Sequence, residues 1–183
     1  MKELSLNILD IAENSYKAKA TLVSIILTES AETLEIEITD DGVGMTEEVL
    51  SSVENPFYTT RTTRKVGMGI PLFKFASEQT GGKLKIISKD IASFPEGHGT
   101  TVTALFYKNH IDFTPLGDVV STVATLVQGH PEIDLLFIHR KEGGEIKLDT
   151  REMREVLEGI PLDTFEVIKW IRDNLAEQYN SIS

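Results

Sequence analysis

The sequence predicts an α/β protein, a two-layer α/β sandwich with a mixed sheet, followed by a C-terminal α+β extension. Three observations favour this fold. Segments with the alternating or β-branched pattern of strands come in pairs, segments with the apolar spacing of helices separate those pairs, and 183 residues are enough for one core with a small appendage. We place the boundary after residue 108, so that the first domain is 1–108 and the extension is 109–183.

The first domain is expected to open with a helix that runs to Ala18, because apolar residues recur along one side of it. After the first pair of strands, Thr46 is expected to cap a short helix that turns Val49 and Leu50 inward. The next helix stops at the glycine pair Gly81 and Gly82. The expected elements are a helix over 4–18, strands over 21–29 and 33–40, a helix after residue 46, a helix from residue 70, and strands over 83–90 and 99–107.

The extension begins with a helical pattern over residues 115–129. DLLFIHR and GEIKLD then form an expected hairpin, which we predict to extend the sheet of the first domain. Two amphipathic helices end the sequence, and Asp163 and Glu166 fit a capping box at the start of the last one. A partner-docking or dimerisation role for the extension stays open.

Composition excludes several classes of protein. The apolar fraction of 40% and charged fraction of 26% are typical of soluble globular proteins. The absence of cysteine excludes disulfides, thiolate zinc sites, iron–sulfur clusters and cysteine nucleophiles. A formal charge of -11 argues against nucleic acid as a partner, because binding it requires cations that neutralise phosphates. No apolar run reaches the ~18 residues of a membrane span and the first residues do not resemble a signal peptide, so we expect a cytoplasmic protein.

The basic residues are unevenly distributed. Residues 1–108 carry 11 basic and 15 acidic side chains, whereas residues 109–183 carry 7 and 14. Within the first domain, residues 55–77 contain no acid, and their bases are Arg61, Arg64, Lys65 and Lys74. Such a window indicates either a local anion site or a solvated basic loop. Its first part lacks apolar periodicity and is expected to be a long loop of the kind that serves as a lid.

Asp10 and Asn14 stand in the middle of the first expected helix, where short polar residues are unfavourable. Their i, i+4 spacing places them on one helix face, with Asn7 before them and Lys17 a turn further along. Two glycine segments complete the pattern. In DDGVGM a strand ends in Asp40 and two alternate glycines follow, and in VGMGI a glycine pair stands at the entry to a helix, directly behind the basic loop.

Together these segments resemble the GHKL superfamily of ATP-binding proteins: DNA gyrase, heat-shock chaperones of the ninety-kilodalton class, sensor histidine kinases and DNA mismatch-repair ATPases. LDIAENSYKAKAT is similar to the N box, DDGVGM to the G1 box, NPFYTTR to the F box of histidine kinases and KVGMGIPL to their G2 box. GGKLKIISK and GHGTTVTALF resemble the closing strands. The resemblance covers residues 4–107 and implies a histidine kinase-like ATP-binding domain of the Bergerat fold.

The resemblance also implies how a nucleotide would be bound. Asp40 would accept a hydrogen bond from the adenine amino group, which makes the ligand ATP rather than GTP, and Thr100 would support this carboxylate. Gly42 and Gly44 would let the backbone approach the base. Asn14 would be a ligand of Mg²⁺, whose other ligands would be phosphate oxygens and waters.

Phosphate binding falls, by the same resemblance, to basic residues and to the second glycine pair. Lys17 is placed like a phosphate contact of histidine kinases, and Gly67 and Gly69 would expose backbone N–H groups at a helix N-terminus. The remaining expected nucleotide-binding residues are the lid bases and the neighbours of the glycines, namely Arg61, Arg64, Lys65, Met45, Val66, Met68 and Ile70.

Asp10 is the candidate catalytic residue. It occupies the position where ATPase branches of the superfamily carry a glutamate that activates the attacking water. Aspartate is one methylene shorter, which puts hydrolysis in question but not nucleotide binding. Lys65 also departs from the family, because histidine kinases often have glycine there. None of the four histidines follows the helical phosphoacceptor pattern of sensor kinases, and the phosphoacceptor unit is not seen before the N box.

Three functions therefore remain open. We favour a stand-alone phosphotransferase, a regulatory kinase domain that acts on a separate partner protein. The alternatives are an ATP-hydrolysing conformational switch that uses Asp10 as a base, and a non-catalytic ATP-gated regulator of the anti-sigma type. A protein partner in trans is expected, a homodimer is left open, and neither nucleic acid nor a membrane is expected as a partner.

Overall fold

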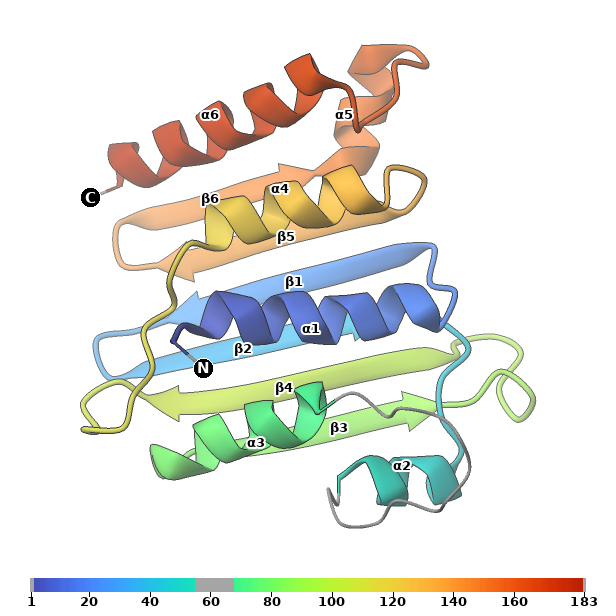
Figure 1. Cartoon of the computed structure of the whole chain (residues 1–183), viewed down its shortest axis with the longest axis vertical. Helices are drawn as coiled ribbons and strands as arrows, with labels where there is room; N and C mark the ends of the chain where they lie inside the picture. Colours follow the sequence, from blue (N-terminus) through green and yellow to red (C-terminus); the bar gives the residue numbers. More distant parts are fainter. Residues whose placement is uncertain (1, 55–67, 183) are drawn as a thin grey trace.

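The structure is a computed structural model that describes residues 2–54 and 68–182. Its elements in chain order are α1 (Leu4–Lys17), β1 (Leu22–Glu29), β2 (Thr33–Asp40), α2 (Glu47–Val53), α3 (Gly69–Gln79), β3 (Lys83–Lys89), β4 (Gly99–Tyr107), α4 (Val119–Gly129), β5 (Asp134–Lys141), β6 (Gly144–Asp149), α5 (Thr150–Leu157) and α6 (Phe165–Ser181). The strands form one sheet in the order β3-β4-β2-β1-β5-β6 (Figure 1).

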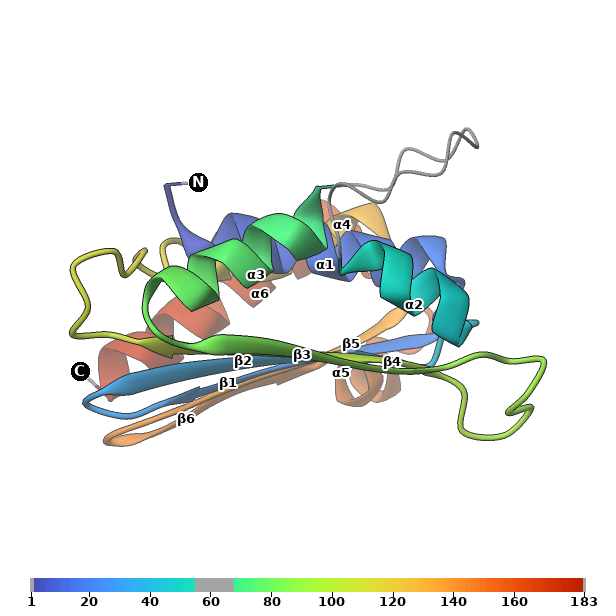
Figure 2. The ribbon, with the colours of Figure 1, turned by 90° about the horizontal axis from the view of Figure 1, so that it is seen from below.

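The predicted two-layer α/β sandwich is confirmed. Figure 2 shows α1, α3 and α4 together over one face of the sheet. Neighbouring strands are antiparallel except β1 and β5, which run parallel, so the sheet is mixed, as predicted. None of the helices in residues 2–54 and 68–182 has both the length and the apolar character needed to cross a membrane.

Alternating strand residues build the core beneath these helices. In β1, Val23, Ile25 and Leu27 are completely buried, whereas the residues between them are only half-buried. This period of two places one row of side chains against the helices and the other row on the opposite face. Phe73 of α3 packs against Phe106 of β4 with ring centroids 5.7 Å apart, which fixes α3 over its half of the sheet.

The β5–β6 hairpin extends the sheet of the first domain, as predicted. β5 pairs with β1 along its length, from Leu22 opposite Asp134 to Thr28 opposite Arg140. Phe137 of β5 is completely buried in the same core as the side chains of β1. The hairpin thereby covers the edge that β1 would otherwise expose.

The outer edge of β6 is covered by α6. The side chain of Gln178 accepts a hydrogen bond from the N–H of Lys147 at 2.8 Å and donates one to the carbonyl of the same residue at 3.0 Å. Backbone groups on an edge strand normally lack such partners and can recruit other strands. At Lys147, therefore, the edge of the sheet is closed by a side chain.

α4 begins later than predicted. The expected helical pattern started at Pro115, but the helix starts at Val119, because Asp118 caps it through its side chain. The carbonyls of Pro115 and Leu116 instead accept hydrogen bonds from the first two N–H groups of α1. Those N–H groups have no partner within their own helix, so this contact satisfies them and holds the preceding segment outside α4.

The capping box predicted for α6 is wrong. Thr164, and not Asp163, is the N-cap residue, and its side chain makes no capping hydrogen bond. Its hydroxyl donates instead to the carbonyl of Pro161 at 3.1 Å. Because the helix starts one residue later than expected, Glu166 stands in the first turn without completing a box.

The prediction for α2 is confirmed in part. Thr46 caps the helix by accepting a hydrogen bond from the N–H of Val49. The side chain of Val49 is nevertheless 46% exposed, which corrects the prediction that it faces inward. α2 lies at the margin of the molecule beside the β3 edge, and only Leu50 and Val53 reach the core (Figure 1).

Candidate functional site

The polar residues of α1 form an accessible stripe. Asp10 and Lys17 are exposed, and Asn14 between them is half-buried. Asn7, expected on the same face, is instead buried, and its Oδ1 has no hydrogen-bond partner in the described structure. Asn7 lies nearer the start of α1, along which α3 runs (Figure 1), so the stripe that a ligand could reach begins at Asp10.

Asp40 ends β2, and two neutral donors hold its carboxylate. The hydroxyl of Ser15 donates to Oδ2 at 2.6 Å, and the N–H of Gly42 donates to Oδ1 at 2.9 Å. Ser15 belongs to α1 and is buried, so its bond ties the helix to the end of the strand. Each carboxylate oxygen can accept more than one hydrogen bond, and Asp40 therefore keeps the capacity to accept another donor.

The neighbouring Asp41 has a structural task. Its carboxylate accepts hydrogen bonds from the hydroxyl and the N–H of Thr21 and from the N–H of Leu22. Burial alone would raise the pKa of Asp41, but these hydrogen bonds outweigh it and lower the pKa overall. Asp41 thus fixes the start of β1, whereas Asp40 faces α1.

The turn after Asp40 leaves no room for side chains. A Cβ on Gly42 would lie 2.7 Å from the carbonyl oxygen of Ala18, and a Cβ on Gly44 would lie 1.9 Å from that of Lys89. Gly44 also has a φ of 69°, which L side chains rarely adopt. The family resemblance implied that these glycines let the backbone come close to the nucleotide base. The structure adds that the protein's own backbone already requires them.

The start of α3 lies against the stripe on α1. A Cβ on Gly69 would lie 3.3 Å from the Cβ of Asp10 and 3.9 Å from Nδ2 of Asn14. The first N–H groups of a helix lack partners within the helix and favour anions. A carboxylate, an amide and a helix N-terminus therefore meet at one place. Of the neighbouring residues, Ile70 is buried and Met68 is exposed.

Thr100 lies opposite Asp40 in the β2–β4 pair, but its hydroxyl has a different partner. It lies 2.7 Å from the hydroxyl of Ser88, which also accepts the N–H of Met45 at 2.8 Å. The resemblance implied that Thr100 supports Asp40; among the described contacts, Ser15 and Gly42 hold this carboxylate, and the Thr100 hydroxyl pairs with Ser88. Thr100 and Ser88 instead hold the turn that contains Met45.

Part of the predicted site lies outside the described residues. This applies to the NPFYTTR motif and to the phosphate-binding residues Arg61, Arg64, Lys65, Val66 and Gly67. Their expected contacts with a triphosphate stay predictions. The described site consists of the α1 stripe, the end of β2 with its turn, and the start of α3.

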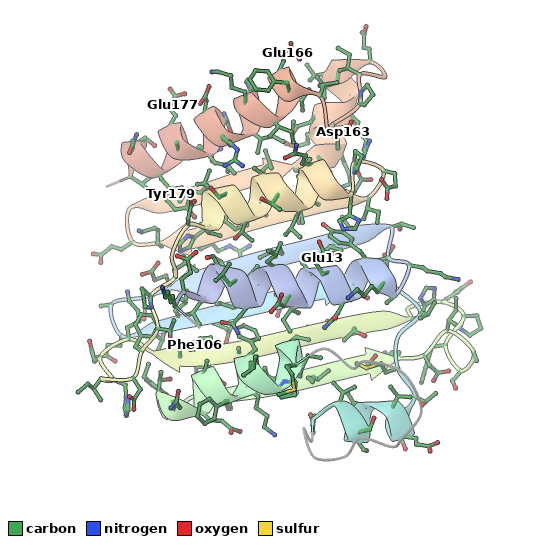
Figure 3. All side chains as sticks on the ribbon, viewed as in Figure 1. Glu13, Phe106, Asp163, Glu166, Glu177 and Tyr179 are labelled. Carbon is green, nitrogen blue, oxygen red and sulfur yellow. The ribbon has the colours of Figure 1, made fainter. Side chains whose placement is uncertain are left out.

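Contacts on the other side of α1 fix its orientation. Glu13, labelled in Figure 3, accepts a hydrogen bond from Nε2 of His130 at 3.1 Å, and the His130 ring stacks on Tyr16 with centroids 3.9 Å apart. Burial, together with the carboxylates of Glu13 and Glu132, raises the pKa of Tyr16, so its hydroxyl stays protonated. Because Glu13 and Asn14 are adjacent, these contacts help to set the direction in which the stripe points.

The sequence did not identify three residues that support the site. Ser15 binds Asp40 from 25 residues away, and Nδ1 of His98 bonds to the carbonyl of Gly42 from 56 residues away. Ser88 holds Met45 in the same manner. Such pairs form only when the chain is folded. One signal was available, because Ser15 directly follows the candidate metal ligand in the N box.

The oxygen donors on α1 suit a hard cation. The carboxylate of Asp10 and the amide oxygen of Asn14 are ligands that Mg²⁺ accepts, and Mg²⁺ in proteins commonly keeps waters and substrate phosphates as its other ligands. Within residues 2–54 and 68–182, no group of three or more histidine, aspartate or glutamate side chains could hold a metal ion. A metal at this place would therefore need oxygens from a ligand, as it has in a magnesium–nucleotide complex.

Comparison with known sequences finds relatives for the first domain. The family model for the histidine kinase-, DNA gyrase B- and HSP90-like ATPases matches residues 1–111. The chain is 28% identical over 94 residues to the sensor protein KdpD of Clostridium acetobutylicum, and 29% identical over 82 residues to the sensor histidine kinase ZraS of Escherichia coli. These matches cover 49% and 45% of this chain, but only 10% and 16% of those longer proteins.

Comparison with solved structures finds the same fold. The Aquifex aeolicus MutL ATPase domain complexed with ADP has a TM-score of 0.55 at 16% identity, with 94% of this chain and 88% of that one covered. The N-terminal domain of a DNA repair protein has a TM-score of 0.55 at 17% identity, with 81% and 53% covered. Because the family model matches more than half of the chain, and the sheet with its helices matches this fold, the protein belongs to the family of histidine kinase-, DNA gyrase B- and HSP90-like ATPases.

Proposed function

We propose that this protein binds Mg-ATP and acts as a regulatory phosphotransferase domain on a separate partner protein. The observation that carries the proposal is the carboxylate of Asp40, which Ser15 and the N–H of Gly42 hold in place beside α1. The α1 stripe and the start of α3 lie close by. This arrangement offers an acceptor for a base, a ligand for a metal and a helix N-terminus for phosphate.

Selectivity for adenine follows from the chemistry of Asp40. An ionised carboxylate only accepts hydrogen bonds. Adenine carries an amino donor at the position where guanine carries a carbonyl acceptor. Asp40 would therefore attract adenine and repel guanine, and its orientation would be fixed by Ser15 and Gly42 before the nucleotide arrives.

The phosphates would lie between α1 and α3. Asn14 would hold Mg²⁺ through its amide oxygen, and the metal would neutralise charge on the phosphate oxygens. Lys17, exposed a turn further along α1, would contact a phosphate directly. The backbone N–H groups at Gly69 would add an electrostatic contribution from the helix, and the basic residues 61–65 would cover the triphosphate.

Transfer to a separate protein is supported by where the histidines lie. The chain has four, and each makes a structural contact: His98 with Gly42, His110 with Asp112, His130 with Glu13, and His139 with Glu29. His110 lies in the connection after β4. The four therefore lack the helical setting of a phosphoacceptor within the chain. Similarity to two sensor proteins also favours phosphotransfer.

ATP hydrolysis is the second candidate, and the placement of Asp10 favours it. Asp10 is exposed and adjoins Gly69, where the γ-phosphate would lie. A carboxylate within hydrogen-bond reach of a water near that phosphate can act as a general base. The shorter side chain of aspartate would weaken this role, which is why we rank hydrolysis below phosphotransfer.

The fate of γ-labelled ATP distinguishes these functions. With Mg²⁺ and purified protein, we expect ATP to bind and the label to stay on ATP, in the parent and in Asp10→Asn alike. In an extract of the source organism, we expect the label to move to a protein other than this chain. Asp10→Glu should release more phosphate than the parent, because it restores the missing methylene.

Two results would contradict the proposal. Release of inorganic phosphate by the parent and not by Asp10→Asn would make the protein an ATPase with Asp10 as its base. Binding of ATP without any transfer in the extract, but with nucleotide-dependent capture of a partner, would make it a non-catalytic regulator.

A further inference from the structure

We propose that the groove between α5 and α6 is a docking site for a basic amphipathic helix of a partner protein. Two adjoining hollows of about 380 and 400 Å³ form this groove, and both are lined by Met153, Leu157 and Trp170. One hollow reaches β6 at Lys147, and the other reaches the α5–α6 connection at Ile160.

Apolar side chains gather around this groove. Single exposed apolar residues are ordinary, but a contiguous group marks an interaction surface. On the short α5–α6 unit, four large apolar side chains are between 51% and 82% exposed, namely Val156, Ile160, Phe165 and Trp170. Tryptophan is also among the residues that contribute most to binding at interfaces.

The charged side chains that line the groove are mostly acidic: they are Asp149, Glu152, Glu166 and one cation, Lys147, which is paired with Glu152. The chain segment that follows the lining residues of α5 adds further acids, and we call these carboxylates the rim. Residues 155–168 contain no basic residue, and their acids are Glu155, Glu158, Asp163 and Glu166. In the part of the chain that the structure describes, none of the four forms an ion pair. Glu166 lines one hollow directly, and Figure 3 shows Asp163 and Glu166 at the end of α6 that meets α5. Carboxylates without an ion pair favour a partner that carries lysine or arginine side chains.

The charge of the rim decides between occupants. A second copy of this chain would bring the same carboxylates to the groove, and like charges across an interface are unfavourable. An anionic membrane surface would be repelled for the same reason. Lysine and arginine side chains would instead pair with the rim and could lie over the face of Trp170 in a cation–π contact.

The backbone of β6 favours a helix over an added strand. A peptide that extends the sheet needs free N–H and carbonyl groups on an edge strand. At Lys147, where the groove meets β6, both groups are bonded to Gln178. A helix needs no such groups, because it binds through apolar side chains spaced by three and four residues. An apolar face in the groove with lysines or arginines on either side fits both the lining and the rim.

This surface is separate from the nucleotide site, which lies at α1, β2 and α3, so docking can be measured without nucleotide. The chain contains a single tryptophan, Trp170, and its fluorescence therefore reports on the groove alone. The probe is a leucine–lysine peptide of about 18 residues, five helical turns, with all leucines on one face. We expect saturable binding with a blue shift of Trp170 emission, and weaker binding as salt is raised.

Charge reversal on the rim tests the proposal against general attraction to an acidic protein. Glu158→Lys with Glu166→Lys should weaken binding at least about tenfold. Glu32→Lys with Glu142→Lys changes the net charge equally at exposed turns outside the groove and should weaken it less than about twofold. Circular dichroism and thermal melting check that each variant is folded. Trp170→Ala should also weaken binding about tenfold, and because this variant has no tryptophan, its binding is measured by the fluorescence anisotropy of a labelled peptide.

Several outcomes would overturn the proposal. Equal weakening by the two charge-reversal pairs, or equal binding of a peptide with the same composition but shuffled leucines, would show non-specific attraction. Self-association of the parent that is lost in Trp170→Ala would make a second copy the occupant. Binding to vesicles of phosphatidylserine with the same shift of Trp170 emission would make it a membrane surface.

Discussion

Two carboxylates at opposite ends of the β1–β2 hairpin are held in different ways. Glu29, at the end of β1, is paired with cations or potential cations: Nζ of Lys108 lies 2.7 Å from Oε1, and Nε2 of His139 lies 2.9 Å from Oε2. Asp40, at the end of β2, has only neutral hydrogen-bond partners among the described residues. Glu29 is thus neutralised within the fold, whereas Asp40, which faces α1, has no cation of the described residues paired with its charge.

The Glu29 cluster shows what a structural polar site looks like in this protein. Burial pushes the pKa of Glu29 upward, but the bonds from Lys108 and His139 outweigh it and lower the pKa. The pKa of His139 is lowered mainly by burial. The neutral ring donates from Nε2 to Glu29 and accepts at Nδ1 from the hydroxyl of Tyr179, whose pKa burial raises. The cluster joins β1, β5 and α6, and so connects the first domain to the extension.

The largest expected effect is the loss of the extension. A chain that ends at residue 108 lacks Leu126 of α4 and Phe137 of β5, which are completely buried in the full chain. The β1 edge and the apolar side chains of the first domain that pack against these two residues would then be exposed. Because domains are stable by only about 5–15 kcal/mol, we expect no cooperative unfolding transition by thermal melting of this fragment. A fragment that melts cooperatively and binds ATP as the full chain does would instead establish residues 1–108 as an independent domain.

The next largest effect concerns the turn after Asp40. In Gly44→Ala, the new Cβ meets the Lys89 carbonyl and φ is unfavourable, so we expect a loss of about 3 kcal/mol or more in the free energy of unfolding. Gly97→Ala is the matched control, because its φ of 82° is also positive but nothing lies within 4 Å of the new Cβ. It should cost about 1 kcal/mol. Equal costs in urea unfolding would show that the tight backbone contact is unimportant.

The smallest expected effect is a change in the pH dependence of stability. The pKa values of His139 and Glu29 are both lower in the folded chain, so the unfolded chain binds more protons and stability falls as pH decreases. The His139 contribution is complete above its ordinary pKa of about 6.5 and is lost below it, and that of Glu29 is lost at lower pH. His139→Gln should reduce the dependence of the melting temperature on pH between about pH 7 and 5, whereas the same substitution at the exposed His110 should leave that dependence unchanged. The same slope in both variants would refute this role.

The fold was predictable from local patterns because each strand alternates and each helix has an apolar stripe. The hairpin of the extension could be assigned to the sheet for the same reason. The start of α4 could not, because it depends on a contact between distant segments: the carbonyls of Pro115 and Leu116 accept hydrogen bonds from the first N–H groups of α1, and this contact leaves no mark in the local sequence. The capping of α6 was missed for a local reason, because the hydroxyl of Thr164 donates to the carbonyl of Pro161, three residues before it, and does not cap the helix.

The position of the candidate site was predictable where a motif marks it, and the nucleotide-binding roles of its residues stay predictions. Asp40 and Asn14 were identified from their motifs. In the structure, α1, which carries Asn14, is bonded through Ser15 to Asp40 at the end of β2, and Gly69 lies against Asn14. Ser15 and His98 were missed because a serine or histidine has many ordinary uses and only the folded chain brings each to its partner. Asn7 was misplaced for the converse reason, since helical periodicity gives a face but not the neighbour that covers it.

The measurement that tests the central claim most directly is calorimetric titration of the full chain with ATP and GTP in the presence of Mg²⁺. The parent should bind ATP at least about tenfold more tightly than GTP. Asp40→Asn should lose about 1.5–3 kcal/mol of ATP binding, roughly 10- to 150-fold, because it removes a charged acceptor. Asp41→Asn, one residue away, should lower stability but leave ATP affinity within about threefold. Unchanged ATP affinity in Asp40→Asn, or an equal loss in Asp41→Asn, would contradict the account.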